Sequence, residues 1–280
     1  MRTSRTLAFL MRLLIDAVVP LAVAYGVISF ITDPAHIDAG ELRSNTLLMH
    51  ARPLFRDAAG DELKGAIGAS AVLLLVAMVG AVLLGVTAGI AYASSRNAPL
   101  KAVAWSVGTI VASLPAFFWA IAVELVMLLL WFRFEFRPLP IAGFGFDEHL
   151  VLPAVALGLR PTAYIFRFTA IAVGEALHAD YVRTAIAKGL SERRLLIRHV
   201  LPNAAPGIIA AAVLAIRGAL SSLLIIEYVY IWGGAGLTFV QALGSRHLEL
   251  ASQLAFAFAL GSIVLTVAAE AARSRMRVVA

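Results

Sequence analysis

Long apolar segments alternate with shorter polar segments along the 280-residue chain. A helix of about 20 apolar residues is long enough to cross the hydrocarbon core of a bilayer. The pattern predicts an all-α integral membrane protein, one domain over residues 1–280, with spans at about 9–31, 65–93, 102–132, 149–173, 206–231 and 250–270. We expect a break in the third span near Pro115, because proline lacks the N–H that a continuous helix needs.

The polar loop at residues 174–205 contains the most polar run of the chain and predicts two short helices around a turn. Asp180 can cap the first helix, and Gly189 can end it in the left-handed conformation. Ser191 can cap the second helix, and Pro202 is expected to end it. The apolar face expected for the first helix consists of Val182, Ala185 and Ile186. The second helix combines an apolar side with a charged side, formed by Leu195, Leu196 and Leu201 and by Arg193, Arg194 and Arg198.

The composition places most of the chain in lipid. Hydrophobic residues make up 61% of it and charged residues 14%, and the mean hydropathy is +0.90. The net charge of +6 does not indicate a nucleic-acid partner, because the lysines and arginines flank apolar segments instead of gathering on a soluble face. The absence of cysteine excludes disulfides and thiolate metal sites.

The distribution of basic residues predicts the orientation of the six spans, because cytoplasmic loops of membrane proteins carry an excess of lysine and arginine. An even number of spans puts both termini on one side, together with the 174–205 loop. That side carries thirteen basic residues: Arg2, Arg5, Arg12, Arg96, Lys101, Arg183, Lys188, Arg193, Arg194, Arg198, Arg273, Arg275 and Arg277. The other side carries seven: Arg43, Arg52, Arg56, Lys64, Arg133, Arg137 and Arg246. Both termini and the loop are therefore expected to be cytoplasmic.

No catalytic motif stands out in the sequence. It contains no Gly-x-x-x-x-Gly-Lys-Ser/Thr phosphate-binding loop, no His-Glu-x-x-His zinc motif and no nucleophile elbow. The six histidines are scattered, and no acidic cluster has metal-ligand spacing. We therefore expect neither an enzyme active site nor a metal site or cofactor in this chain.

The polar loop resembles a known family. Gly189, followed after nine residues by His199-Val200-Leu201-Pro202, matches the cytoplasmic loop signature of permease subunits of binding-protein-dependent ABC importers. The stretch from Asp180 to Ser191 resembles the dipeptide, oligopeptide and nickel branch of this family. Arg183-Thr184-Ala185 stands where the general pattern has Glu-Ala-Ala, so Arg183 departs from it. Ser113–Trp119 and Glu227–Leu237 also resemble segments of that branch, with Gly233 in place of its usual proline.

The resemblance implies a type I ABC importer permease in the inner membrane of a bacterium or archaeon. Such a subunit forms half of a translocation path for peptides. A second, related permease forms the other half, and an extracytoplasmic substrate-binding protein delivers the substrate. Partner ATPase subunits bind ATP and Mg²⁺ and hydrolyse the ATP, and the two helices at residues 180–201 dock on them. The residues implied in this coupling are Asp180, Arg183, Ala185, Gly189, Leu190, Leu195, Leu196, Leu201 and Pro202. Leu190, Leu195 and Leu196 are the side chains expected to insert into the ATPase groove.

Two alternatives remain open. Within the family, the substrate could instead be nickel, a metal chelate or glutathione. From another class, the chain could be a stand-alone secondary transporter, which predicts intramembrane carboxylates for ion coupling and no docking loop. Glu124 is the chief carboxylate inside a span, and the docking loop is present, so this second alternative is disfavoured.

Two arginines near the middle of predicted spans require a separate explanation, because a charge there is usually paired or faces a pathway. One hypothesis is that Arg160 or Arg217 faces the translocation path and meets a carboxylate or phosphate of the substrate. The alternative, which the sequence favours, is a structural ion pair with Glu124 on the third span.

Three further features concern packing. Gly80, Gly85 and Gly89 recur at helical spacing, which allows either a close helix contact or ordinary packing in lipid. We expect Glu227 to brace the Gly233–Gly236 loop. The aromatic cluster at the outer end of the fifth span is typical of a membrane interface and consists of Tyr228, Tyr230 and Trp232.

Overall fold

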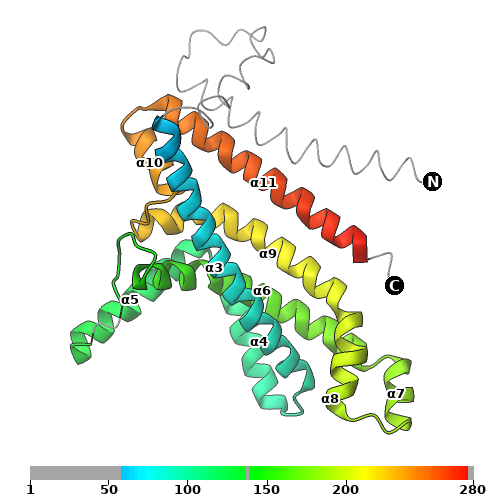
Figure 1. Ribbon diagram of the computed structural model, residues 1–280. Coiled ribbons are helices and arrows are strands. Elements are labelled where there is room, and N and C mark those ends of the chain that lie inside the picture. The colour runs from blue at the N-terminus through cyan, green and yellow to red at the C-terminus, as the bar shows by residue number, and fades with distance from the viewer. Residues whose placement is uncertain (1–57, 137–138, 277–280) are drawn as a thin grey trace, which may run out of the picture.

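The computed structural model describes residues 58–136 and 139–276, and every regular element within these ranges is a helix (Figure 1). The predicted span at residues 9–31 lies outside the described residues. The long helices are α3 (Ala58–Ser94), α4 (Ala98–Ser113), α5 (Ala116–Phe134), α6 (Val151–Leu177), α9 (Leu201–Val229) and α11 (Leu248–Met276). The shorter elements are a 3₁₀ turn (Glu148–Leu150), α7 (Asp180–Ala187), α8 (Glu192–Leu195), a π-helical turn (Leu196–Val200) and α10 (Ala235–Gly244).

Five helical stretches in the described part of the chain are long and apolar enough to cross a membrane. They are Leu63–Ser94, Ala116–Phe134, Glu148–Leu177, Glu192–Val229 and Leu248–Leu265. Each overlaps a predicted span. Helix α3 begins seven residues earlier than the predicted 65, and α6 continues four residues beyond the predicted 173, so the polar loop is shorter than expected.

The predicted third span consists of two separate helices, α4 and α5, which diverge from each other (Figure 1). The break lies at Leu114 and Pro115, both in extended conformation, as expected from the proline. It leaves carbonyl groups at the end of α4 without partners in the helix. The indole Nε1 of Trp119 donates to the Val111 carbonyl at 3.1 Å, which satisfies one of them. The break is therefore a defined turn.

Among the described elements, α3 and α6 form the most extensive helix contact, and glycines allow their close approach. A Cβ at Gly85 would lie 2.8 Å from the Cβ of Ile165, and a Cβ at Gly89 would lie 2.5 Å from that of Thr169. Two of the three recurring glycines therefore serve a close contact, as one of the two interpretations predicted. Gly80 does not, since a Cβ there would meet nothing within 4 Å.

Helix α9 packs on the other side of α6, so that α3, α6 and α9 form the centre of the molecule (Figure 1). Their shared core is built mainly from alanine and leucine, including Leu73, Ala77, Leu157 and Leu223. Helix α5 extends away from this core (Figure 1), and only Ala116 and Ala120 among its residues are buried. The polar loop at residues 174–205, which we call the coupling loop after the role that the resemblance implies, lies at one end of the bundle (Figure 1). Helix α10 lies at the opposite end with the start of α3.

Candidate functional site

The turn between α7 and α8 is fixed by a complete helix-ending motif centred on Gly189. The N–H of Gly189 donates to the carbonyl of Ile186 at 2.9 Å, and the N–H of Leu190 donates to that of Ala185 at 3.2 Å. Gly189 has φ +78°, in the left-handed region that only glycine enters without penalty. The side chain of Leu190 packs into the same cluster as Ala185, as the motif requires. Gly189 therefore ends α7 as predicted.

The helix starts and the second helix end differ from the prediction. Ala179 is the N-cap of α7, and Asp180 is its first helical residue, so the carboxylate of Asp180 makes no capping hydrogen bond. Ser191 is the N-cap of α8, but its hydroxyl caps nothing. Pro202 does not end a helix: it lies in the first turn of α9, where the missing N–H needs no partner. The π-helical turn joins α8 to α9, so the helix runs unbroken from Glu192 to Val229 and bends near this turn (Figure 1).

The leucines of the loop pack against the protein's own core, and Leu195 is buried there, so its side chain is not free to insert into an ATPase groove as expected. Leu195 is only 6% exposed. It joins Val182 and Ala185 in a buried cluster with residues of α6 and α9, and Leu190, Leu196 and Leu201 pack against this cluster, partly buried. Periodicity shows which residues share a face, but not whether that face meets the chain itself or a partner. These leucines therefore hold the coupling loop rigidly on α6 and α9.

The residues exposed on the outward face of the loop differ from those predicted. Ile186, predicted to share the apolar face of Val182, is 59% exposed, and Tyr181 is also exposed. The same helix carries exposed charged side chains: a terminal guanidinium nitrogen of Arg183 lies 3.8 Å from Oδ1 of Asp180, and both side chains are largely exposed. Three basic residues of α8 and the π-helical turn are exposed as well, namely Arg193, Arg194 and Arg198. We call Tyr181, Ile186 and these charged residues the outward face.

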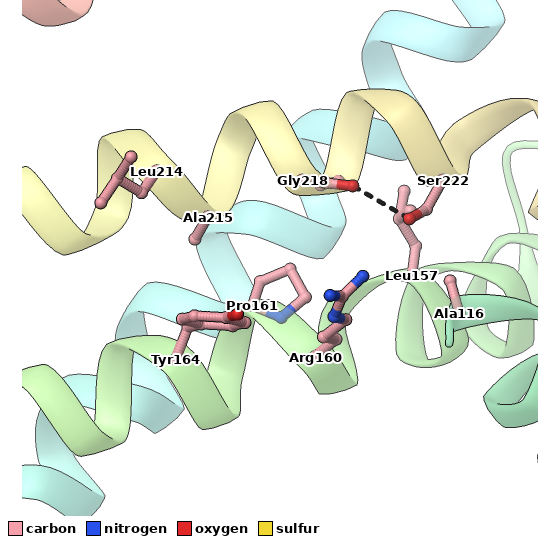
Figure 2. Close-up of a pocket in the computed structure, with 10 residues that line it drawn as sticks. Ala116, Leu157, Arg160, Pro161, Tyr164, Leu214, Ala215, Gly218 and Ser222 are labelled. Atoms are coloured by element: carbon pink, nitrogen blue, oxygen red, sulfur yellow. Dashed lines mark hydrogen bonds between the residues drawn. The ribbon is translucent and has the colours of Figure 1, made fainter. Parts of the chain in front are cut away.

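A pocket of about 330 Å³ lies between α6 and α9, near the start of α5 (Figure 2). Its walls are mostly apolar, and its one charged residue is Arg160. The side chain of Arg160 extends from α6 into the gap, with its guanidinium toward α9 (Figure 2). The lining residues are Ala116, Leu157, Arg160, Pro161, Tyr164, Leu214, Ala215, Gly218, Ala219 and Ser222.

The predicted ion pair between Glu124 and an arginine of α6 or α9 is wrong. Among the described residues, no salt bridge links Glu124 to Arg160 or to Arg217. Instead, Nε of Arg160 donates to the carbonyl of Ala112 at 3.3 Å, one of the carbonyls that the α4–α5 break frees. Arg217 is exposed on α9 and does not line the pocket. Sequence reasoning missed this partner because a free carbonyl at a helix break carries no side-chain signature.

At the opposite end of the bundle, Glu227 braces the start of α10, as predicted. Its side chain is fully buried, and Oε2 accepts hydrogen bonds from the backbone N–H groups of Gly236 (2.6 Å) and Leu237 (3.3 Å). The hydroxyl of Ser70 on α3 donates to Oε1 and accepts from the N–H of Ala235. Glu227 thus joins α3, α9 and α10 through one carboxylate.

The aromatic residues beside this junction do not all lie at a membrane interface. Trp232 and Tyr230 are buried, and their polar atoms donate to carbonyls of Ala69 (3.3 Å) and Ala120 (3.1 Å). Tyr228 is exposed, which fits the interfacial interpretation for this one residue. Two of the three aromatics therefore stabilise the junction of helices instead of anchoring it in headgroups.

Comparison with solved structures shows the fold. A chain of the MetNI methionine ABC transporter in an inward-facing conformation superposes with a TM-score of 0.64 at 15% sequence identity, over 80% of this chain and 98% of that chain. A chain of an amino acid ABC transporter superposes with a TM-score of 0.57 at 16% identity, over 77% of this chain and 94% of that one. At these identities the likeness is one of architecture, and it confirms the expected type I permease fold.

Comparison of sequences places the chain among transport permeases. The dipeptide transport system permease protein of Bacillus subtilis is 32% identical over 190 residues, which cover 68% of this chain and 60% of that protein. The glutathione transport system permease protein of Escherichia coli is 29% identical over 210 residues, which cover 75% of this chain and 67% of that protein. Residues 81–278, well over half of the chain, match the family of binding-protein-dependent transport system inner membrane components. This protein therefore belongs to that family.

Proposed function

We propose that this chain is the transmembrane subunit of an ATP-driven importer in the inner membrane of a bacterium or archaeon. It forms half of a translocation path for peptides and is coupled to a cytoplasmic ATPase through residues 180–201. A second, related permease completes the path, and an extracytoplasmic binding protein delivers the substrate. ATP and Mg²⁺ are bound by the ATPase.

The outward face of the coupling loop is the observation that carries this proposal. Ile186 is 59% exposed on a helix whose opposite side, Val182 and Ala185, is buried in the chain's own core. An exposed isoleucine on a helix that also exposes charged residues, here Asp180 and Arg183, is typical of a protein-docking surface with an apolar centre and a polar rim. The Gly189 turn and the buried leucines fix this face relative to α6 and α9. A push on the face would therefore move the helices that line the pocket.

The chemistry of the named relatives supports peptides as the substrate class. One is a dipeptide permease and the other a glutathione permease, and both substrates are short peptides. Nickel, a metal chelate or glutathione itself is the competing substrate within the family. A stand-alone secondary transporter would not need a rigid loop with an exposed apolar centre, because it docks on no ATPase. It is therefore the weaker candidate.

The test is co-purification of the full-length chain from its native membrane, with ATPase activity measured in the eluate. We expect the wild type to bring down an ATPase and a second permease. Ile186→Asp should reduce the recovered ATPase at least tenfold, because it puts a charge at the apolar centre of the docking surface. Leu243→Asp is the matched control, since Leu243 is an exposed apolar residue on α10 at the opposite end of the bundle.

Three results would count against the proposal. The wild type could be recovered intact without an ATPase, which would favour the stand-alone transporter. Ile186→Asp could retain the full amount of ATPase, which would remove the outward face as the docking surface. Leu243→Asp could lose the ATPase equally, which would mean that any exposed charge destabilises the assembly.

A further inference from the structure

We propose that the pocket between α6 and α9 binds the carboxylate of the transported substrate through Arg160. The inference rests on the proposed function, since it names the group of the peptide that this part of the path recognises. It selects short peptides that have a free C-terminal carboxylate next to a small or apolar side chain. Arg160 accounts for the preference for a carboxylate, and the apolar walls of the pocket account for the preference for a small or apolar side chain.

Among the residues that the structure describes, no carboxylate neutralises the charge of Arg160. No salt bridge to Arg160 exists within the described part of the chain, and none of the residues that line the pocket is acidic. An arginine inside a membrane span is usually paired, or faces a pathway that supplies a partner. The carboxylate of a substrate entering the pocket would meet this requirement.

The orientation of the guanidinium leaves its donors available. Among the described residues, its one hydrogen bond runs from Nε to the Ala112 carbonyl at 3.3 Å, and its Cζ lies 5.9 Å from the centre of the Tyr164 ring. These contacts fix the guanidinium at the α4–α5 break and leave the terminal N–H groups free of hydrogen bonds within the described part of the chain. The two terminal nitrogens lie in the gap and point toward α9 (Figure 2). Two N–H groups of a fixed guanidinium match the two oxygens of a carboxylate, the strongest arrangement that an arginine offers.

The other residues that line the pocket are compatible with a small or apolar side chain on the substrate residue that carries the carboxylate. Leu157, Ala215, Ala219 and Ala116 supply apolar walls, and the volume of about 330 Å³ falls in the range of about 300–1,000 Å³ typical of small-molecule sites. The hydroxyl of Ser222 already donates to the carbonyl of Gly218 at 2.9 Å. Arg160 is therefore the strongest anion-binding group in the pocket.

The competing explanation is that Arg160 only caps α4. A cation at the C-terminal end of a helix interacts favourably with the helix dipole, and Nε satisfies a free carbonyl there. Capping alone accounts for one nitrogen of the guanidinium and requires no anion. The two roles differ in whether the charge of Arg160 acts on molecules that enter the pocket.

The experiment uses the fact that the chain contains no cysteine. Ser222→Cys places a single thiol in the pocket, and the full-length chain is purified with the subunits that accompany it. The rates of reaction with an anionic and a cationic methanethiosulfonate reagent are then compared. Arg160 should favour the anionic reagent, and Arg160→Gln should lower the anionic-to-cationic rate ratio by on the order of tenfold. Arg160→Lys, which keeps the charge, should retain most of the ratio.

The control is Ser221→Cys, because Ser221 is the exposed neighbour of Ser222 and does not line the pocket. Its rate ratio should not change with Arg160→Gln. A second readout uses the dipeptide Ala-Ala and its C-terminal amide. The free acid should slow labelling of the Ser222→Cys thiol, and the amide should protect it several-fold less.

The proposal is overturned if the ratio is the same with arginine and glutamine at position 160, which leaves capping as the only role. It is also overturned if the amide protects as well as the free acid, or if the Ser222→Cys thiol does not react at all. Labelling requires no ATP hydrolysis. These failures are therefore distinct from failure of the proposed function, which would show as loss of the ATPase in co-purification.

Discussion

Glu227 shows how one residue can organise three helices. A buried carboxylate costs several kcal/mol unless it is well hydrogen-bonded. Here the hydroxyl of Ser70 and the N–H groups of Gly236 and Leu237 all donate to it. The two N–H groups belong to the first turn of α10, where helix N–H groups have no partner within the helix and favour negative charge. Burial of this carboxylate is therefore offset by donors that would otherwise be unsatisfied.

This arrangement predicts unequal effects of two substitutions at Glu227. Glu227→Ala should lower the free energy of unfolding by roughly 2–4 kcal/mol, because it leaves two buried backbone donors and the Ser70 hydroxyl without an acceptor. Glu227→Gln keeps one acceptor oxygen and should have a smaller effect. The measurement is the midpoint of thermal unfolding in detergent. Glu249→Ala removes an exposed glutamate from the first turn of α11 and should lower the midpoint much less, because a carboxylate there contributes only about 0.3–1 kcal/mol.

At the scale of an element, the packing of α3 against α6 likewise depends on single residues. Gly89 lies so close to α6 that an added Cβ would be 2.5 Å from the Cβ of Thr169 and 2.8 Å from the carbonyl oxygen of Phe166. Backbone atoms and a β-branched side chain cannot move aside easily. The two helices must therefore separate to accept any side chain there.

We accordingly expect Gly89→Ala to destabilise the protein by about 1–3 kcal/mol through overpacking. Gly80→Ala on the same helix meets open space and should be neutral, or stabilising by up to about 1 kcal/mol, because alanine is the better helix former. Thermal unfolding of the two variants, measured side by side, separates close packing from helix propensity. Equal midpoints would show that the α3–α6 contact tolerates a Cβ.

The positions of the helices could largely be predicted from the sequence, whereas the side of each helix that is buried could not. Apolar segments longer than a bilayer is thick must be helices, and Pro115 must interrupt one, so these features follow from the sequence alone. Leu195 and Ile186 are both apolar residues of the coupling loop, yet one is buried in the chain's own core and the other is exposed. Tertiary packing against α6 and α9 decides this, and periodicity carries no information about it. The hydrogen-bond partner of Arg160 could not be predicted either, because it is the backbone carbonyl of Ala112 and not a charged side chain.

At the scale of the whole molecule, the two ends of the bundle have different roles. The coupling loop lies at one end, and the Glu227 junction with α10 lies at the other (Figure 1). The excess of basic residues predicts that the coupling loop is cytoplasmic and that the α10 end faces outward.

Single cysteines test this orientation without background labelling, because the chain has none of its own. Ser191 in the coupling loop and Ser245 after α10 are both exposed. In intact cells stripped of any outer membrane barrier, a membrane-impermeant thiol reagent should label Ser245→Cys. Ser191→Cys should react only after the inner membrane is permeabilised. The reverse pattern would invert the topology and place the proposed ATPase-docking surface on the wrong side.

The unbroken helix from Glu192 to Val229 affects the timing of movements at the two ends of the bundle. At about 1.5 Å per residue, its 38 residues extend roughly 57 Å, from the coupling loop to the Glu227 junction. No flexible linker interrupts this path, although it bends near the π-helical turn. A displacement produced at the end that carries the coupling loop would therefore reach the Glu227 junction without delay. Release of substrate inward and closure toward the outside would then occur as a single mechanical event, not as two successive ones.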